Sequence, residues 1–215
     1  PYSNRMHPGK LSIMLLAYQS ERRLENAVTE IDTSLSAAGI PHEIVIIDDG
    51  STDQSFAKAR ELAQRMENIS AYSLSRNYTS PMAQFAGLEM CTGQCACPMP
   101  DDGQRPIAHI IDMYRLWEKG HKIILGYREG RDDGRVNDFF SNGYYSFMNR
   151  FSEITFPPGG SDGYLIDREI IDLLNTRISK RNTTPVIELL KLGYSTVFVP
   201  YQRPQRAGKS RWTLR

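Results

Sequence analysis

The sequence predicts an α/β fold, with a mostly parallel central sheet flanked by helices. In the first 125 residues, short aliphatic runs alternate with longer segments of helical periodicity. One such run, Ile44 to Ile47, is entirely β-branched, which suits a strand that is covered on both faces. Repeated strand–helix units of this length imply parallel strands joined by right-handed crossovers.

The elements of this first half follow from the apolar patterns and from residues typical of turns and caps. We expect strands at 11–16, 43–48, 69–74, 94–99 and 122–125, separated by helices at 21–38, 54–66, 81–89 and 107–119. Gly39 ends the first helix. Gly50 permits the turn before the second helix, which Ser51, Thr52 or Asp53 can cap. Ser80 caps the third helix, with Pro81 in its first position.

The regular alternation weakens after Tyr127. The charged, glycine-rich stretch 126–138 is too long for a simple connector, so we interpret it as part of a site or a lid. Further along we expect an aromatic-rich helix at 139–151, a turn-rich segment at 156–163, a short strand at 164–166, helices at 169–174 and 186–192, and a last strand at 195–199. Asp167 and Arg168 are expected to pair around a helix start.

Composition and charge restrict the class of protein. A chain of 215 residues is long enough to bury a substantial core. No apolar run approaches the roughly 20 residues that cross a bilayer. Residues 1–10 lack the apolar segment of a signal peptide, and we expect a disordered arm or a cloning remnant there, with Met6 as a candidate natural start. The net charge is +1, and we expect no nucleic-acid partner.

Positive charge is concentrated at the end of the chain. After Pro200 the sequence contains five cations and no acid: Arg203, Arg206, Lys209, Arg211 and Arg215. We interpret this basic tail as a solvated arm, a pyrophosphate clamp or a surface that meets anionic lipid headgroups.

Three cysteines, Cys91, Cys95 and Cys97, raise the question of a zinc site. Their odd number, the lack of a C-x-x-C pair and the lack of a nearby histidine argue against one. Cys95 and Cys97 instead alternate along the strand expected at 94–99, and Cys91 ends the helix before it. We therefore expect reduced thiols, as in the cytosol.

The strongest functional signal is EIVIIDDGSTD, which runs from Glu43 to Asp53. Asp48 and Asp49 end a buried strand, where open α/β sheets bind their ligands. Two adjacent carboxylates there are costly unless a ribose, a base edge or a metal needs them. A strand followed by an N-capped turn would explain Gly50 and Asp53 but not the pair.

Six motifs follow one another along the chain: LLAYQSER, IIDDGSTD, LSRNYTSPMAQFAGL, GYREGRDD, SDGYLIDR and RPQRAGKSRW. In this order they resemble the family 2 glycosyltransferases, especially the polyprenyl-phosphate branch that includes dolichol-phosphate mannose synthases. The resemblance covers Leu11 to about Leu214. It implies a single catalytic domain at 11–215 with the Rossmann-like GT-A fold, in which 11–125 is the nucleotide-binding half and 126–215 the acceptor half.

The resemblance implies a site for a nucleotide-sugar donor that is UDP-, GDP- or dTDP-linked. The donor-binding residues would be Ala17, Tyr18, Glu21, Asp48, Asp49, Ser51, Arg76, Asp101, Gln104, Arg206, Lys209 and Ser210. Carboxylates that accept hydrogen bonds from ribose hydroxyls or a base N–H would supply specificity. For Tyr18, an ordinary aromatic side chain at a strand end is an equal alternative.

The metal motif departs from the family's pattern. Relatives carry Asp-X-Asp followed by Leu-Gln, whereas this chain reads MPDDGQRP. Pro100 takes the first Asp position, Asp101 the middle and Asp102 the second. Asp102 with Asp101 would hold Mg²⁺ or Mn²⁺ against the donor pyrophosphate. The alternative is that DDG forms only a surface turn.

The resemblance also implies inverting transfer of the sugar in one displacement. Arg128 and Arg131 match the family's phosphate-facing arginines, and with Arg206 and Lys209 they would neutralise the leaving diphosphate. Asp162 would be the base or the group that orients the acceptor.

Three further interpretations concern the acceptor and the class of activity. The arginines and the basic tail favour a polyprenyl phosphate acceptor over a growing saccharide, and imply membrane association on the cytoplasmic side; the oligomeric state is open. Pro100 favours one rival, a catalytically weak nucleotide-sugar binding protein. A nucleotidyltransferase would need a glycine-rich loop after the first strand, and LLAYQSERR contains no glycine.

Overall fold

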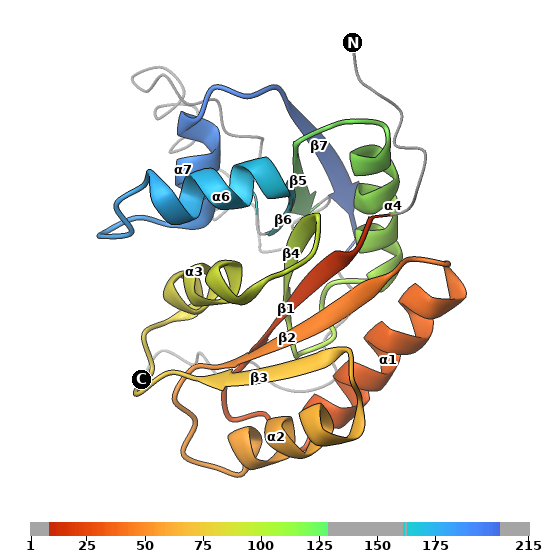
Figure 1. Ribbon diagram of the computed structural model, residues 1–215, viewed down its shortest axis with the longest axis vertical. Coiled ribbons are helices and arrows are strands. Elements are labelled where there is room, and N and C mark those ends of the chain that lie inside the picture. The colour runs from red at the N-terminus through yellow and green to blue at the C-terminus, as the bar shows by residue number, and fades with distance from the viewer. Residues whose placement is uncertain (1–8, 129–160, 162, 203–215) are drawn as a thin grey trace, which may run out of the picture.

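The computed structural model describes residues 9–128, 161 and 163–202. A seven-stranded sheet forms its centre, in the order β3-β2-β1-β4-β6-β5-β7 (Figure 1). The strands are β1 (Leu11–Ala17), β2 (His42–Asp48), β3 (Ile69–Ser73), β4 (Cys95–Pro100), β5 (Ile123–Arg128), β6 (Gly163–Asp167) and β7 (Thr196–Tyr201). The helices are α1 (Leu24–Ala37), α2 (Ser55–Arg65), α3 (Ser80–Met90), α4 (Ile107–Glu118), α6 (Arg168–Thr176) and α7 (Pro185–Lys191).

The predicted mostly parallel sheet is confirmed. β1 pairs in parallel with β2 and β4, β2 with β3, and β5 with β7. Only β6 runs antiparallel within this described sheet, and it lies between β4 and β5. The carboxyl ends of all the other strands therefore meet at one edge of the sheet, where ligands of open α/β folds bind.

Helices cover both faces of the sheet. Alternate residues of β1 show the division: Leu11, Ile13 and Leu15 join the apolar cluster under α1, α2 and α4, while Met14 joins the cluster under α3, α6 and α7. Side chains that alternate along a strand in this way point to opposite faces. Trp117 of α4 belongs to the first cluster and is fully buried.

Several boundaries differ from the sequence predictions. The first helix begins at Leu24 and not at residue 21, because Glu21–Arg23 form a turn. Thr79, and not Ser80, occupies the N-cap position of α3, and its side chain makes no capping hydrogen bond. β5 continues to Arg128, so the beginning of the loop expected at 126–138 is strand. The rest of that loop and the helix expected at 139–151 lie outside the described residues.

Asp167 and Arg168 lie at a helix start, as predicted, and each binds other parts of the fold. Asp167 is the N-cap of α6: one carboxylate oxygen accepts from the Glu169 N–H at 3.0 Å and the other from Trp117 Nε1 at 2.8 Å. Arg168 donates from Nε to the Gly93 carbonyl at 2.9 Å and forms an ion pair of 3.5 Å with Asp172. The two adjacent side chains therefore tie the start of α6 to different parts of the fold.

The cysteines behave as predicted. Cys95 and Cys97 lie in β4, Cys91 follows α3, and all three thiols are buried. Burial raises the pKa of Cys91 to about 12. Among the residues that the structure describes, no helix is both long and apolar enough to span a bilayer.

Candidate active site

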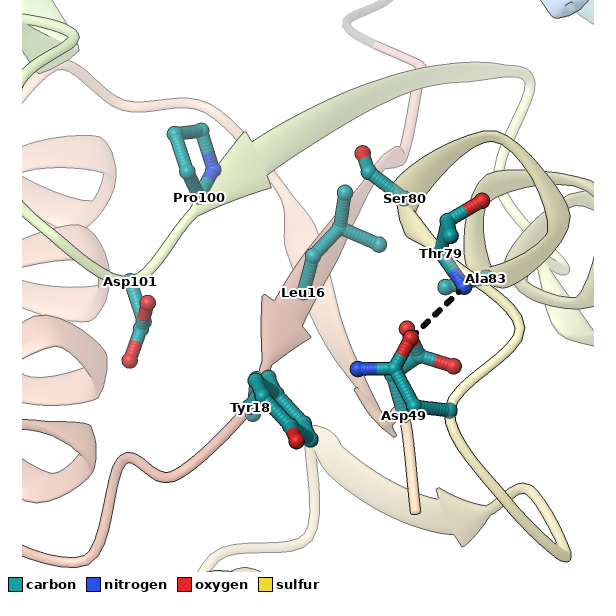
Figure 2. Close-up of a pocket in the computed structure, with 10 residues that line it drawn as sticks. Leu16, Tyr18, Asp49, Thr79, Ser80, Ala83, Pro100 and Asp101 are labelled. Carbon is teal, nitrogen blue, oxygen red and sulfur yellow. Dashed lines mark hydrogen bonds between the residues drawn. The ribbon is translucent and has the colours of Figure 1, made fainter. Parts of the chain in front are cut away.

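A pocket of about 520 Å³ opens at the carboxyl edge of the sheet, where β1, β2 and β4 end and α3 begins. It is lined by Leu16, Ala17, Tyr18, Asp49, Asn77, Thr79, Ser80, Ala83, Pro100 and Asp101. Figure 2 shows Pro100 and Asp101 on one side and Thr79 and Ser80 on the other, with Tyr18 between them. This is the switch point of the sheet, since the chain leaves β1 toward β2 and later returns to its other side as β4. The volume suits a small-molecule ligand.

Asp48 and Asp49 have different surroundings. The Asp48 carboxylate is buried, and its Oδ2 accepts from Ser73 Oγ at 2.8 Å and from the Ser51 N–H at 3.3 Å. Asp48 Oδ1 is buried without a hydrogen-bond partner among the described residues. Asp49 lines the pocket, and its Oδ1 accepts from the Tyr78 N–H at 2.8 Å. Asp49 is thus the member of the pair that a ligand in this pocket would meet.

The turn after β1 brings Tyr18 into the pocket, where 45% of its surface stays exposed. Two other predicted donor residues hold this turn in place. Ser51 Oγ accepts from the Gln19 N–H at 2.9 Å, and Glu21 Oε2 accepts from the Gln54 N–H at 3.1 Å. Neither Ser51 nor Glu21 is among the residues that line the pocket.

The segment before α3 closes the pocket and packs against Gly50. A Cβ atom on Gly50 would lie 2.3 Å from the carbonyl carbon of Arg76, and its φ of +66° also favours glycine. The Arg76 guanidinium lies over the Tyr78 ring, 4.3 Å from its centroid. Both side chains are exposed, and neither is among the residues that line the pocket, so a donor contact of Arg76 stays a prediction.

The MPDDGQ segment contributes one buried carboxylate to the pocket. Asp101 is 9% exposed, and its Oδ2 accepts from Arg23 Nη2 at 2.8 Å and from Nε at 3.2 Å. Asp102 is half-buried, and its Oδ1 accepts from the N–H of Gln104, which is itself buried. Residues 101–103 form a turn, as the alternative of a DDG surface turn predicted, but Asp101 within it is buried and not a surface residue.

The chemistry of these residues fits a hard divalent cation in part. Asp101 and Asp102 offer carboxylate oxygens, which Mg²⁺ and Mn²⁺ prefer. Within the described ranges, no three His, Cys, Asp or Glu side chains are grouped so that they could hold a metal. One or two protein ligands suffice for an ion of this kind when water and phosphate oxygens complete its coordination.

The remaining predicted residues belong to the second half of the chain. Arg128 ends β5 beside Tyr201 of β7, at the same edge of the sheet as the pocket. Arg131, Asp162, Arg206, Lys209 and Ser210 lie outside the described residues. Sequence reasoning missed Arg23 and the pocket residues at the start of α3. Thr79 and Ser80 belong to the motif LSRNYTSPMAQFAGL, which could have indicated them. No sequence pattern could have indicated Arg23, because a charged residue before a helix is common and does not mark a site.

Comparisons with known proteins agree with this geometry. The family described as glycosyl transferase family 2 matches residues 12–173. An uncharacterized glycosyltransferase of Synechocystis sp. is 27% identical over 205 residues, which cover 94% of this chain and 64% of that protein. The bactoprenol glucosyl transferase of Shigella phage SfX is 31% identical over 172 residues, covering 79% and 56%. The chain thus spans less than two thirds of the length of these relatives.

Solved structures with low sequence identity share the fold. The glucosyl-3-phosphoglycerate synthase of Mycobacterium tuberculosis, in complex with Mn²⁺, UDP and phosphoglyceric acid, is 16% identical with a TM-score of 0.63, covering 94% of this chain and 72% of that one. The mannosyltransferase PcManGT of Pyrobaculum calidifontis, in complex with GDP-Man and Mn²⁺, is 13% identical with a TM-score of 0.60, covering 96% and 61%. The chain therefore belongs to glycosyltransferase family 2 and has the GT-A fold.

Proposed function

We propose that this chain is the catalytic domain of an inverting glycosyltransferase, which moves a sugar from a nucleotide-sugar donor to a polyprenyl phosphate. The observation that carries the proposal is the pocket at the switch point of the sheet, where the Asp49 carboxylate, the exposed Tyr18 ring and the buried Asp101 carboxylate come together. A nucleoside offers hydroxyls and base N–H groups to a carboxylate and a flat face to an aromatic ring.

The metal part of the proposal concerns Asp101 and Asp102. These carboxylates would hold Mg²⁺ or Mn²⁺ together with phosphate and water oxygens. When bound, the ion would neutralise charge that develops on the leaving diphosphate. The two structural neighbours described above were solved with Mn²⁺ and a nucleotide, which supports the use of a divalent ion.

The acceptor is proposed from the relatives and from one described arginine. A bactoprenol glucosyl transferase is among the relatives, and its name indicates a polyprenyl acceptor. Arg128 brings a cation to the same edge of the sheet as the pocket, and a guanidinium suits a phosphate through its planar pair of donors. Arg131, Arg206, Lys209 and Ser210 would add phosphate contacts, and Asp162 would orient the acceptor. Association with the cytoplasmic face of a membrane is part of this proposal.

The chemistry of the acceptor decides how much the protein must do. A phosphate oxygen is already anionic at neutral pH, so it can attack the anomeric carbon without a strong base. A saccharide hydroxyl must lose its proton, and it would require Asp162 as a general base. A phosphate acceptor therefore predicts a modest effect of Asp162→Asn on the maximal rate, and a saccharide acceptor a large one.

A transfer assay tests the proposal. The protein is incubated with Mn²⁺, polyprenyl phosphate in detergent and radiolabelled UDP-glucose, GDP-mannose or a dTDP-sugar, and the lipid phase is extracted. We expect label in the lipid phase with one donor, and much less label with Asp49→Asn. Label in a saccharide acceptor alone would replace the lipid acceptor in the proposal, and no transfer from any donor would contradict it.

One observation favours a second candidate. Pro100 lines the pocket. By the family resemblance it takes the position of the first aspartate of the metal motif, which would leave the site with one carboxylate fewer for a metal. A nucleotide-sugar binding protein with little turnover would show binding of the same nucleotide in the pocket but no transfer in the assay above.

A further inference from the structure

Arg23 connects two walls of the pocket without lining it. It lies just before α1, yet its guanidinium forms an ion pair of 2.8 Å with Asp101, which follows β4. Its Nη2 also lies 3.3 Å from Ser20 Oγ, the atom that accepts from the Tyr18 N–H at 3.0 Å. One guanidinium therefore holds both the turn that carries Tyr18 and the carboxylate on the opposite side of the switch point.

The ion pair with Arg23 uses only one of the two carboxylate oxygens of Asp101. Nε and Nη2 of Arg23 both donate to Oδ2, at 3.2 and 2.8 Å. Oδ1 accepts no hydrogen bond from any residue in the described part of the chain. The Asp101 side chain is 9% exposed and that of Arg23 37%, so solvent screens this pair less than a pair on the open surface.

We propose that Arg23 is a positioning residue that sets the balance between metal-ion binding and nucleotide binding in this pocket. The inference rests on the proposed function, since it takes a divalent cation and a nucleoside diphosphate as the ligands. The positive guanidinium, 2.8 Å from the Asp101 carboxylate, offsets part of the negative charge that this side chain presents to a ligand. It also occupies one oxygen that a cation would otherwise use.

Two consequences of opposite sign follow. Removing the guanidinium leaves Asp101 with its full charge and with both oxygens available, so a free divalent cation should bind more tightly. The same uncompensated carboxylate should repel the diphosphate when no metal is present, so metal-free nucleotide binding should weaken. A residue that only braced the fold would instead weaken both interactions together.

The test compares Arg23→Gln with Arg22→Gln. Gln keeps the polar end of the side chain but removes the charge. Arg22 is a matched control because it is the adjacent arginine, its side chain is 91% exposed and its contact with Glu21 is 4.0 Å long. Mn²⁺ binding is measured by electron paramagnetic resonance without nucleotide. Binding of UDP, GDP and dTDP is measured by calorimetry in the presence of EDTA.

We expect Arg23→Gln to bind Mn²⁺ about three times more tightly or better, and to lose about tenfold in metal-free affinity for the nucleotide that the wild type prefers. Arg22→Gln should match the wild type in both. Arg23→Lys retains the charge and should stay close to the wild type in Mn²⁺ affinity. If circular dichroism shows that the Gln variant does not fold, Arg23→Met, which also removes the charge and keeps most of the side chain's length, takes its place with the same expected results.

The outcomes separate this inference from the proposed function. Unchanged or weaker Mn²⁺ binding in a folded Arg23→Gln would overturn it, as would a parallel loss of both affinities or an absence of Mn²⁺ binding in both proteins. If the wild type binds no nucleotide under any condition, the proposed function fails, and the Mn²⁺ titrations still decide whether Arg23 controls the Asp101 carboxylate.

Discussion

Replacing Glu43 with glutamine should destabilise the protein at neutral pH and flatten its acid sensitivity. Glu43 lies at the start of β2, at the amino edge of the sheet and opposite the pocket, where its carboxylate accepts several hydrogen bonds. Its Oε1 accepts from Ser12 Oγ at 2.6 Å and from the Thr92 N–H at 2.7 Å, and its Oε2 accepts from Thr92 Oγ1 at 2.6 Å and Lys10 Nζ at 3.0 Å. This carboxylate therefore joins the starts of β1 and β2 to the connection between α3 and β4.

The size of the effect follows from the pKa of Glu43. Burial alone would raise this pKa, but the hydrogen bonds from Ser12, Thr92 and Lys10 outweigh burial and lower it from 4.5 to about 2. At about 1.4 kcal/mol per pH unit, this shift corresponds to about 3 kcal/mol, and to about 2 kcal/mol after allowance for partial exposure to solvent. Because the pKa of the folded state is depressed, this stabilisation is complete above pH 4.5 and is lost as the pH falls toward 2.

Urea unfolding at pH 7 and at pH 3 measures the effect. We expect Glu43→Gln to be less stable than the wild type by about 2 kcal/mol at pH 7, and the difference to shrink by more than half at pH 3. Glu67→Gln is the control, because Glu67 is exposed and the same loss of a formal charge should leave stability unchanged at both values. An equal difference at the two pH values, or none at pH 7, would refute the assignment of the stabilisation to the ionised carboxylate.

Three further predictions concern the turn, a helix cap and the thiols. Gly50→Ala should lower the free energy of unfolding in urea by about 2 kcal/mol or more and weaken nucleotide binding. The reason is that the new Cβ would lie 2.3 Å from the Arg76 backbone and that φ is +66°. Unchanged nucleotide affinity would contradict this prediction. Asp167→Ala should lower the free energy of unfolding in urea by about 2 to 3 kcal/mol, since α6 loses its cap and the buried Trp117 Nε1 loses its acceptor. A loss well below about 1 kcal/mol would contradict this prediction. The cysteine thiols should react with a disulfide reagent at the rate of unfolding, because all three are buried; fast labelling of the native protein would contradict their placement.

Local patterns were sufficient to predict most of the sheet. The run Ile44 to Ile47 predicted a strand covered on both faces, and these residues are buried between the two helical layers. The place of β6 could not be predicted in this way. Its sequence indicates a strand at 164–166, but whether that strand pairs with β4 and β5 in an antiparallel sense depends on contacts with residues far along the chain.

The site was predictable in kind but not in its details. The pair Asp48–Asp49 marked the edge of the sheet at which the pocket opens, but only Asp49 lines that pocket. Strand periodicity contains this information, since adjacent side chains near a strand end point in opposite directions. The contact between Arg23 and Asp101 spans 78 positions in the sequence and depends on the geometry of two turns, so no local pattern announces it.

Calorimetric titration of UDP, GDP and dTDP, with and without Mn²⁺, tests most directly whether the pocket is a nucleotide site. The wild type is compared with Tyr18→Ala, which removes a ring from the pocket, and with Tyr72→Ala, which removes one of similar exposure from β3. We predict tight binding of one nucleotide, strengthened by Mn²⁺, reduced about tenfold or more by Tyr18→Ala and unchanged by Tyr72→Ala. Binding that is indifferent to Tyr18, or no binding of any nucleotide, would contradict the account.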